Sequence, residues 1–166
     1  MINKKAQAWG VDLTIAVIIF SVGIVVFFIY SVNFSGEAKE NLDSLSYEGD
    51  VLFNSLLSEG YPQDWSLNSV VKIGILDNDR INETKLEMFY NLAKDDYQKT
   101  KSIFNTRFDY YFFMNENMTI NSKGVSGIGK PGINKDNINA KNLIKITRFT
   151  IYREKPVTTY LYIWEE

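Results

Sequence analysis

The segment Leu13–Val32 constrains this chain more than any other feature. Its twenty residues contain no charged side chain. At about 1.5 Å per residue, a helix of this length spans roughly 30 Å, which is the thickness of the hydrocarbon core of a bilayer. Because lipid offers no hydrogen-bond partner to backbone amides, a single isolated segment can cross it only as a helix. The sequence therefore predicts a membrane-spanning helix over about residues 12–32.

The charges that flank this helix predict its orientation. Lys4 and Lys5 precede it, whereas Glu37 is the first charged residue that follows it. Since lysine and arginine are enriched on the cytoplasmic side, we expect a single-pass protein of the cell membrane, with the N-terminus in the cytoplasm and the chain from Asn33 onward outside the cell. The apolar run is longer than that of an ordinary secretory signal and offers no small-residue cleavage site behind it, so we expect no cleavage there.

The composition narrows the class of function. The chain has 166 residues, a net charge of −2, no histidine and no cysteine. The absence of histidine removes the commonest general base and the commonest transition-metal ligand, and it leaves the serines without a partner for a catalytic triad. Without cysteine, an exported domain must be held by its core alone. We therefore expect no enzyme, no cofactor, no metal and no small-molecule substrate.

Apolar residues at helical spacing continue beyond the membrane segment. This helix stripe consists of Leu42, Leu45, Gly49, Leu52 and Leu56. Its intervals of three and four residues predict a long helix over about residues 7–58. We expect a break or kink at residues 33–36 and an end before Gly60 and Pro62, a pair typical of helix C-termini.

The rest of the chain, residues 59–166, predicts a small head domain outside the cell. Thr84 and Glu87 form a capping box at the start of a second helix that we expect to reach about Asn105. Its buried stripe is predicted to be Leu86, Phe89, Ala93, Tyr97, Thr100 and Phe104. Alternation and aromatic content predict strands at 69–76, 108–113, 142–152 and 157–164, with a turn at 153–156 and a polar loop over 121–142. The expected fold class is α+β: a long N-terminal helix packed on a small antiparallel sheet, with one additional helix.

The residues directly before the apolar run suggest a family. Lys5-Ala6-Gln7 resembles the processing site of archaeal class III prepilins, which is cut after Ala or Gly and before Gln. A helix that is half membrane span and half support for a sheet is also similar to type IV pilin-like proteins. The resemblance implies that a prepilin peptidase cuts between Ala6 and Gln7, which removes residues 1–6 as a leader. It further implies a structural subunit that joins a surface filament by packing Leu13–Val32 against other pilin-like subunits.

One position departs from the common pilin pattern. Many pilins carry Glu as the fifth mature residue, where it neutralises the N-terminal amine of a neighbouring subunit. Here Val11 is fifth and Asp12 is sixth. Asp12 is therefore a candidate partner for that amine, which fits a minor or accessory subunit; alternatively, it lies at the level of the lipid headgroups and pairs with water or Lys5.

A second interpretation is a tether that never polymerises. In this alternative, the chain is a single-pass envelope protein that presents its α+β head as an adhesin or complex subunit. The helix stripe separates the two interpretations. A monomeric tether should cover the stripe with its own head, whereas a filament subunit should leave it partly exposed.

Three sequons lie on the expected exterior, and they make Asn33, Asn82 and Asn117 candidates for N-glycosylation. Chance matches are common in a chain this rich in asparagine, so both explanations stay open. Asn33 lies close to the membrane, which favours Asn82 and Asn117 as acceptors.

Three further patterns have simpler explanations. The residues 77–79 (DND) begin like a calcium loop, but Ile81 stands where a ligand is needed, so we expect a turn. The glycine-rich residues 127–132 precede no helix and read as a flexible loop rather than a dinucleotide site. Lysines around Tyr97 and Phe104 could bind single-stranded DNA, yet both aromatics belong to the predicted buried stripe. We therefore expect no nucleic-acid partner.

Overall fold

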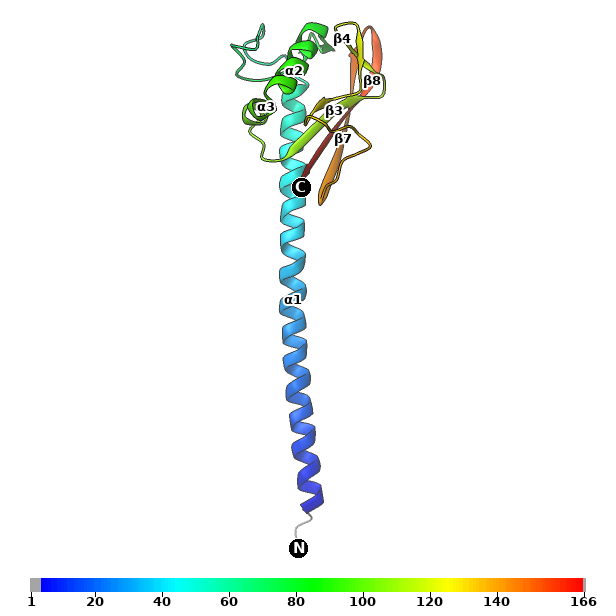
Figure 1. Cartoon of the computed structure of the whole chain (residues 1–166). Helices are drawn as coiled ribbons and strands as arrows, with labels where there is room; N and C mark the ends of the chain where they lie inside the picture. The colour runs from blue at the N-terminus through cyan, green and yellow to red at the C-terminus, as the bar shows by residue number, and fades with distance from the viewer. Residues whose placement is uncertain (1–3, 166) are drawn as a thin grey trace. The chain divides into compact units, whose positions relative to one another are not determined.

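The computed structural model describes the backbone of residues 4–165 and the side chains of residues 10–32 and 41–165. The chain divides into two units, Met1–Asn41 and Leu42–Glu166, which we call the helical unit and the head unit (Figure 1). The first helix, α1 (Lys4–Leu56), runs through the helical unit and supplies the first element of the head unit.

The helix α1 is continuous through residues 33–36, where the sequence predicted a break. That prediction was wrong for a local reason. A single interior glycine costs a helix only about 1 kcal/mol, and the residues that follow it (EAKE) are strong helix formers. The expected end is confirmed: α1 stops at Leu56, and Gly60 takes the left-handed conformation, with φ +79°.

The segment 69–76 is not the strand that its alternation predicted: an isolated antiparallel bridge joins Lys72 to Tyr61, and the first named strand, β1, covers only Leu76–Asp77. Instead, the segment closes the C-terminus of α1. The amide of Ile75 donates to the carbonyl of Leu56 at 2.8 Å, and the amide of Leu76 donates to that of Ser58 at 2.9 Å. Gly74 passes so close that an added Cβ would lie 2.3 Å from the amide nitrogen of Gly60. Helix-end carbonyls need donors, and this segment supplies them.

The main sheet has six strands in the order β1-β2-β7-β8-β3-β6. Its other members are β2 (Arg80–Ile81), β3 (Asp109–Met114), β6 (Ile128–Gly129), β7 (Asn142–Tyr152) and β8 (Lys155–Glu165). All neighbours are antiparallel except β2 and β7. The long strands β3, β7 and β8 confirm the predicted antiparallel sheet, and a two-residue turn at Arg153-Glu154, with φ values of 51° and 63°, joins the last two. The α+β layout is therefore as expected.

The predicted second helix is two helices, α2 (Glu83–Asp95) and α3 (Tyr97–Phe104). The cap of α2 is Asn82, whose side chain accepts from the amide of Lys85, and not Thr84 as the capping box suggested. Asp96 leaves the helical conformation and caps α3 by accepting from the amide of Lys99. All six residues of the predicted buried stripe are nevertheless buried.

The segment 121–142 is only partly the loop that its composition predicted. A second, two-stranded sheet pairs β4 (Met118–Ile120) with β5 (Lys123–Val125). The strand β6 then pairs with β3, and Gly129 lies so near it that an added Cβ would be 2.2 Å from the carbonyl oxygen of Tyr110. Gly129, which was predicted to lie in a flexible loop, therefore allows a close backbone contact.

The core of the head unit lies between the sheet and the helices. Leu52, Phe53 and Leu56 of α1 belong to one large buried cluster that also contains residues of α2, α3 and the inner face of the sheet. The other face of the sheet carries a separate aromatic cluster around Tyr111, Phe113 and Trp164. The head unit is thus held by apolar packing on both faces, as a chain without cysteine requires.

Candidate functional site

The candidate functional surface is the apolar part of the helical unit. The stretch Gly10–Val32 of α1 is 23 residues long and wholly exposed, and it is long and apolar enough to cross a membrane. Every described side chain in it, from Gly10 to Val32, is exposed. An isolated helix that is apolar on all sides requires lipid or other apolar helices around it. This surface is therefore consistent with a single-pass anchor.

The proposed leader site and the residues near it lie at the start of α1. Ala6 and Gln7 are within the helical backbone, but their side chains, like that of Asn33, lie outside the described residues. Asp12 is described and exposed at the N-terminal end of the apolar stretch. Its role as a partner for an amine stays a prediction.

The head unit covers most of the helix stripe. Leu45, Leu52 and Leu56 are buried, and Gly49 packs so tightly that an added Cβ would lie 2.7 Å from Cδ1 of Ile146. Leu42, at 41% exposure, is the one member of the stripe that remains accessible. Four of the five positions therefore follow the pattern expected of a tether.

The two described candidate acceptors differ in their surroundings. Asn82 is half-buried, and its Oδ1 accepts from the Lys85 amide at 3.1 Å as the cap of α2. Asn117 is exposed in the connection between β3 and β4. A glycan attaches to the amide nitrogen, so the cap of Asn82 leaves its acceptor atom unused. Glycosylation of either residue stays a prediction.

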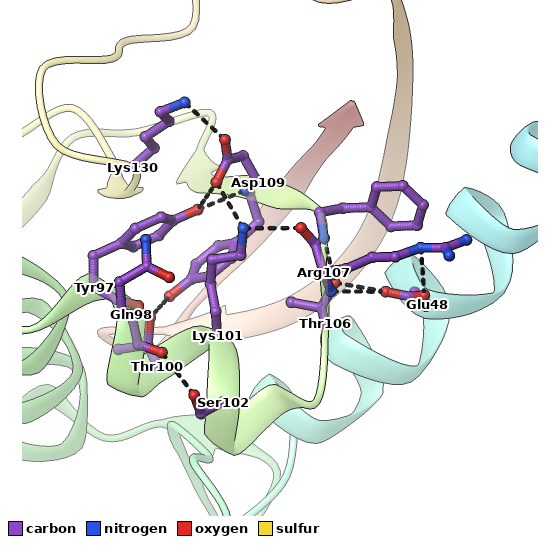
Figure 2. Close-up of polar contacts among 12 residues, drawn as sticks. Glu48, Tyr97, Gln98, Thr100, Lys101, Ser102, Thr106, Arg107, Asp109 and Lys130 are labelled. Atoms are coloured by element: carbon purple, nitrogen blue, oxygen red, sulfur yellow. Dashed lines mark hydrogen bonds and ion pairs between the residues drawn. The ribbon is translucent and has the colours of Figure 1, made fainter. Parts of the chain in front are cut away.

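A charged cluster around Asp109 was missed by sequence reasoning (Figure 2). Asp109 Oδ1 accepts from Lys101 Nζ at 3.0 Å and from the hydroxyl of Tyr97 at 3.1 Å, and Oδ2 accepts from Lys130 Nζ at 2.7 Å. The hydroxyl of Tyr97 in turn accepts from the amide of Tyr110 at 3.0 Å. The cluster ties α3 and the residue after β6 to the start of β3. The one available signal was a lone carboxylate in an otherwise aromatic strand.

The pKa values in this cluster follow from burial and pairing. Burial acts to raise the pKa of Asp109, but hydrogen bonds from Lys130 and Lys101 and their positive charges outweigh it, so the pKa lies below the usual range. Burial raises the pKa of Tyr97 and of Tyr110 far above that of a free phenol. The carboxylate is thus ionised and the phenols are neutral near pH 7, which suits a structural cluster.

The pattern considered for DNA binding has four basic residues, Lys94, Lys99, Lys101 and Arg107. Lys101 and Arg107 make ion pairs within the head unit, and Lys99 Nζ donates to the carbonyl of Leu67 at 3.1 Å. Lys101 belongs to the Asp109 cluster, and Arg107 lies 3.6 Å from the carboxylate of Glu48 (Figure 2). Tyr97 and Phe104 are buried, as predicted, so neither ring offers a face for stacking a base.

The other two sequence patterns, residues 77–79 and the glycine-rich residues 127–132, also have local structural roles. Asn78 and Asp79 form the tight turn between β1 and β2, both with positive φ, so the DND stretch is a turn as expected. A cavity of about 270 Å³ lies beside residues 127–133 and is lined also by Tyr90, Lys94 and Tyr111. Of its two lysines, Lys130 is held by Asp109.

Comparisons of this chain with protein-family models, curated proteins and solved structures find no match. Its function is therefore argued from its own residues.

Proposed function

We propose that this chain is a structural pilin-like subunit, minor or accessory, of an archaeal type IV pilus-like surface filament. One observation carries the proposal: the single helix α1 is apolar and wholly exposed over Gly10–Val32, and its last part contributes Leu52, Phe53 and Leu56 to the core of an α+β head. A helix of this kind can serve first as a membrane anchor and then as the element that packs against other subunits.

The charges at the N-terminus suggest how the helix would move from the membrane into a filament. Lys4 and Lys5 hold the helix at the cytoplasmic face of the membrane. Cleavage between Ala6 and Gln7 by a prepilin peptidase removes both charges. The helix can then leave the lipid, since the same apolar surface finds apolar neighbours in a filament. Asp12 would pair with the new amine of a neighbour, which compensates a charge next to an apolar region.

The alternative is a non-polymerising tether whose head acts as an adhesin or complex subunit. The cover over the helix stripe favours this alternative, because Leu45, Leu52 and Leu56 have no surface left for a neighbouring subunit. Under the filament proposal, lateral contacts would instead use Gly10–Val32 and the accessible Leu42.

The deciding experiment is analysis of the intact mass and the N-terminal peptide of the protein from its native membrane. The filament proposal expects a mature chain that begins at Gln7. Ala6→Gly should still be processed, because the site accepts either small residue, whereas Ala6→Leu should accumulate the uncut chain. A native chain that begins at Met1 or Ile2 and retains both lysines would contradict the filament proposal and favour the non-polymerising tether.

Peptide masses from the same preparation test the expected orientation of the chain in the membrane. Additional mass on peptides that contain Asn82 or Asn117 would place the head outside the cell. Thr84→Ala and Thr119→Ala remove the two sequons without changing the asparagines, so the added mass should disappear from the corresponding peptide alone.

A further inference from the structure

The cavity of about 270 Å³ beside residues 127–133 lies at one edge of the main sheet. The strand β6 forms that edge, because it is the last strand in the order and, within the described residues, pairs only with β3. One wall of the cavity comes from α2, through Tyr90, Ala93 and Lys94, and the opposite wall comes from residues 127–133. Tyr111 of β3 also lines it. We call this space the edge cavity.

The wall formed by residues 127–133 is fixed by contacts with the rest of the head unit. The amide of Lys130 donates to the carbonyl of Tyr110 at 3.0 Å, and Lys130 Nζ donates to Asp109 at 2.7 Å (Figure 2). Ile133 packs against the aromatic cluster on the other face of the sheet. The edge cavity is therefore formed before any ligand binds, as is usual for small-molecule sites.

Several polar groups of the two walls have no partner in the protein. Within the part of the chain that the structure describes, neither the hydroxyl of Tyr90 nor the ammonium group of Lys94 makes a hydrogen bond or an ion pair. The bond from the Lys130 amide to Tyr110 sets the alternation between β6 and β3, so residues 128 and 130 bond toward β3. The N–H and C=O groups of Gly129, which lines the edge cavity, therefore point away from β3.

The charges around the edge cavity favour an anion. Asp109 accepts from both Lys101 and Lys130, so one carboxylate faces two ammonium groups and one positive charge remains. Lys94 in the wall adds a second positive charge, and among the described residues no acidic side chain lines the cavity. A carboxylate on a bound molecule would therefore find its partner at Lys94.

The size and the walls of the edge cavity favour a single sugar ring. Ligand pockets of about 300–1,000 Å³ hold drug-sized molecules, so a volume of about 270 Å³ suits one six-membered ring rather than a stretch of peptide or polynucleotide. The rings of Tyr90 and Tyr111 offer apolar surface to the C–H groups of a sugar. Its hydroxyls match the Tyr90 hydroxyl and the backbone of Gly129, which a plain aromatic acid would leave unpaired.

We propose that the edge cavity binds one carboxylate-bearing sugar residue, a hexuronate, with its carboxylate at Lys94 and its ring hydroxyls at Tyr90 and Gly129. The site belongs to the head unit alone. It goes beyond the proposed function, since it requires neither leader cleavage nor a filament.

Saturation-transfer NMR titration tests the proposal on the full-length chain, in a detergent without a sugar headgroup. The probes are methyl glucuronide, its uncharged amide and acetate. The amide keeps the ring and its hydroxyls, whereas acetate keeps only the carboxylate. We expect methyl glucuronide to bind at least about fivefold more tightly than the amide, because only the carboxylate pairs with Lys94. Acetate at equal concentration should not displace methyl glucuronide.

Three variants locate the contacts. Lys94→Gln should remove the preference for methyl glucuronide, while unchanged binding of the amide shows that the cavity is intact. Lys72→Gln is the matched control, because Lys72 is exposed and does not line the cavity, and it should keep the preference. Tyr90→Phe retains the ring and removes the hydroxyl, so it should weaken both sugars by the same factor, about threefold.

Three results would overturn the proposal. One is methyl glucuronide that does not bind, or that binds no more tightly than its amide. Another is displacement of methyl glucuronide by acetate at equal concentration, which would mean that the cavity takes any carboxylate. The third is a preference for methyl glucuronide that survives Lys94→Gln. None of these outcomes is affected by where the mature chain begins, so failure of this proposal and failure of the filament proposal are distinguishable.

Discussion

Two parts of α1 carry many apolar side chains, and they differ in what can remove those side chains from water. Both Gly10–Val32 and the final stretch of the helix, from Leu42, are rich in apolar residues. In the final stretch these residues form a stripe and alternate with charged residues such as Glu48 and Asp50, and the head covers the stripe. In Gly10–Val32 the only charged side chain is Asp12 at its N-terminal end, apolar residues lie on all sides of the helix, and none of the stretch is buried. A stripe can be satisfied within one chain, whereas an all-round apolar surface needs lipid or other helices.

The largest expected effect comes from truncating one leucine in each part. Leu52 is fully buried in the head core, and Leu13 is 67% exposed in the helical unit. Leu52→Ala should lower the free energy of unfolding of the head by about 2–5 kcal/mol, because it removes buried contacts and leaves a cavity. Leu13→Ala should leave that free energy unchanged. Urea unfolding of the detergent-solubilised chain, followed through the buried Trp65 and Trp164, measures both.

The contrast between the two parts of α1 would be contradicted if Leu52→Ala and Leu13→Ala lowered the free energy of unfolding of the head by similar amounts. An effect of Leu13→Ala on unfolding of the head would mean that the apolar surface of the helical unit also packs within the chain. Its role as a surface for lipid or other subunits would then be wrong.

The next largest effect is expected from glycine, the smallest residue in each part. An added Cβ at Gly49 would lie 2.7 Å from Ile146 and 2.9 Å from Ile163, whereas one at Gly23 would have no neighbour within 4 Å. Gly49→Leu should destabilise the head by about 1–3 kcal/mol through overpacking. Gly23→Leu should leave unfolding of the head unchanged and strengthen membrane association.

Membrane flotation and the same urea titration separate these two outcomes. Equal unfolding midpoints for Gly49→Leu and the native chain would show that the contact between α1 and the sheet yields easily. The close approach at Gly49 would then contribute little to the position of α1 in the head.

The carboxylates of the two parts provide a third, somewhat smaller test. Asp109 has three donors within the head, whereas Asp12 lies at the end of the apolar helix surface. Asp109→Asn should cost about 1–3 kcal/mol near pH 7, because two lysines lose a charged acceptor. Asp12→Asn should not change unfolding of the head.

The pH dependence of this loss follows from the lowered pKa of Asp109. A carboxylate whose pKa is lower in the folded than in the unfolded state stabilises the fold above the unfolded pKa, about 3.9 for Asp. This stabilisation disappears as the pH falls through the folded pKa. The difference between the native chain and Asp109→Asn should therefore be full at pH 6 and shrink below about pH 4. A difference that is constant down to pH 2.5 would contradict ionic pairing at Asp109.

Sequence reasoning succeeded where a pattern is local. The buried stripe from Leu86 to Phe104 and the strand pair at the C-terminus depend on periodicity within one segment, and both were predicted. The break at Asp96 escaped detection because Ala93 and Tyr97 keep the four-residue spacing across it, so the stripe looks continuous although the helix is not.

The predicted break at residues 33–36 was a local error, because the helix formers after Gly36 outweigh it, but the other errors concern contacts between segments that are distant in the chain. The amides of Ile75 and Leu76 serve the end of α1 instead of a sheet, and no feature of their own sequence indicates this. The Asp109 cluster depends on α3, which supplies Lys101 and Tyr97, and on the pairing of β6 with β3, which brings Lys130 to the carboxylate. The surface of Gly10–Val32 needed no such contact, which is why the sequence predicted it most directly.

The smallest expected effect concerns the start of α2, where the two parts of one sequon have different structural roles. Asn82 caps the helix, and Thr84 lies in its first turn. Asn82→Ala should cost about 1 kcal/mol through the lost cap, whereas Thr84→Ala should change stability by a few tenths. Both variants remove the sequon, so a shared loss of added mass with unequal unfolding midpoints would separate glycosylation from capping. Equal midpoints would mean that the cap at Asn82 contributes nothing measurable, and that the start of α2 is fixed by the burial of Leu86 and Phe89 instead.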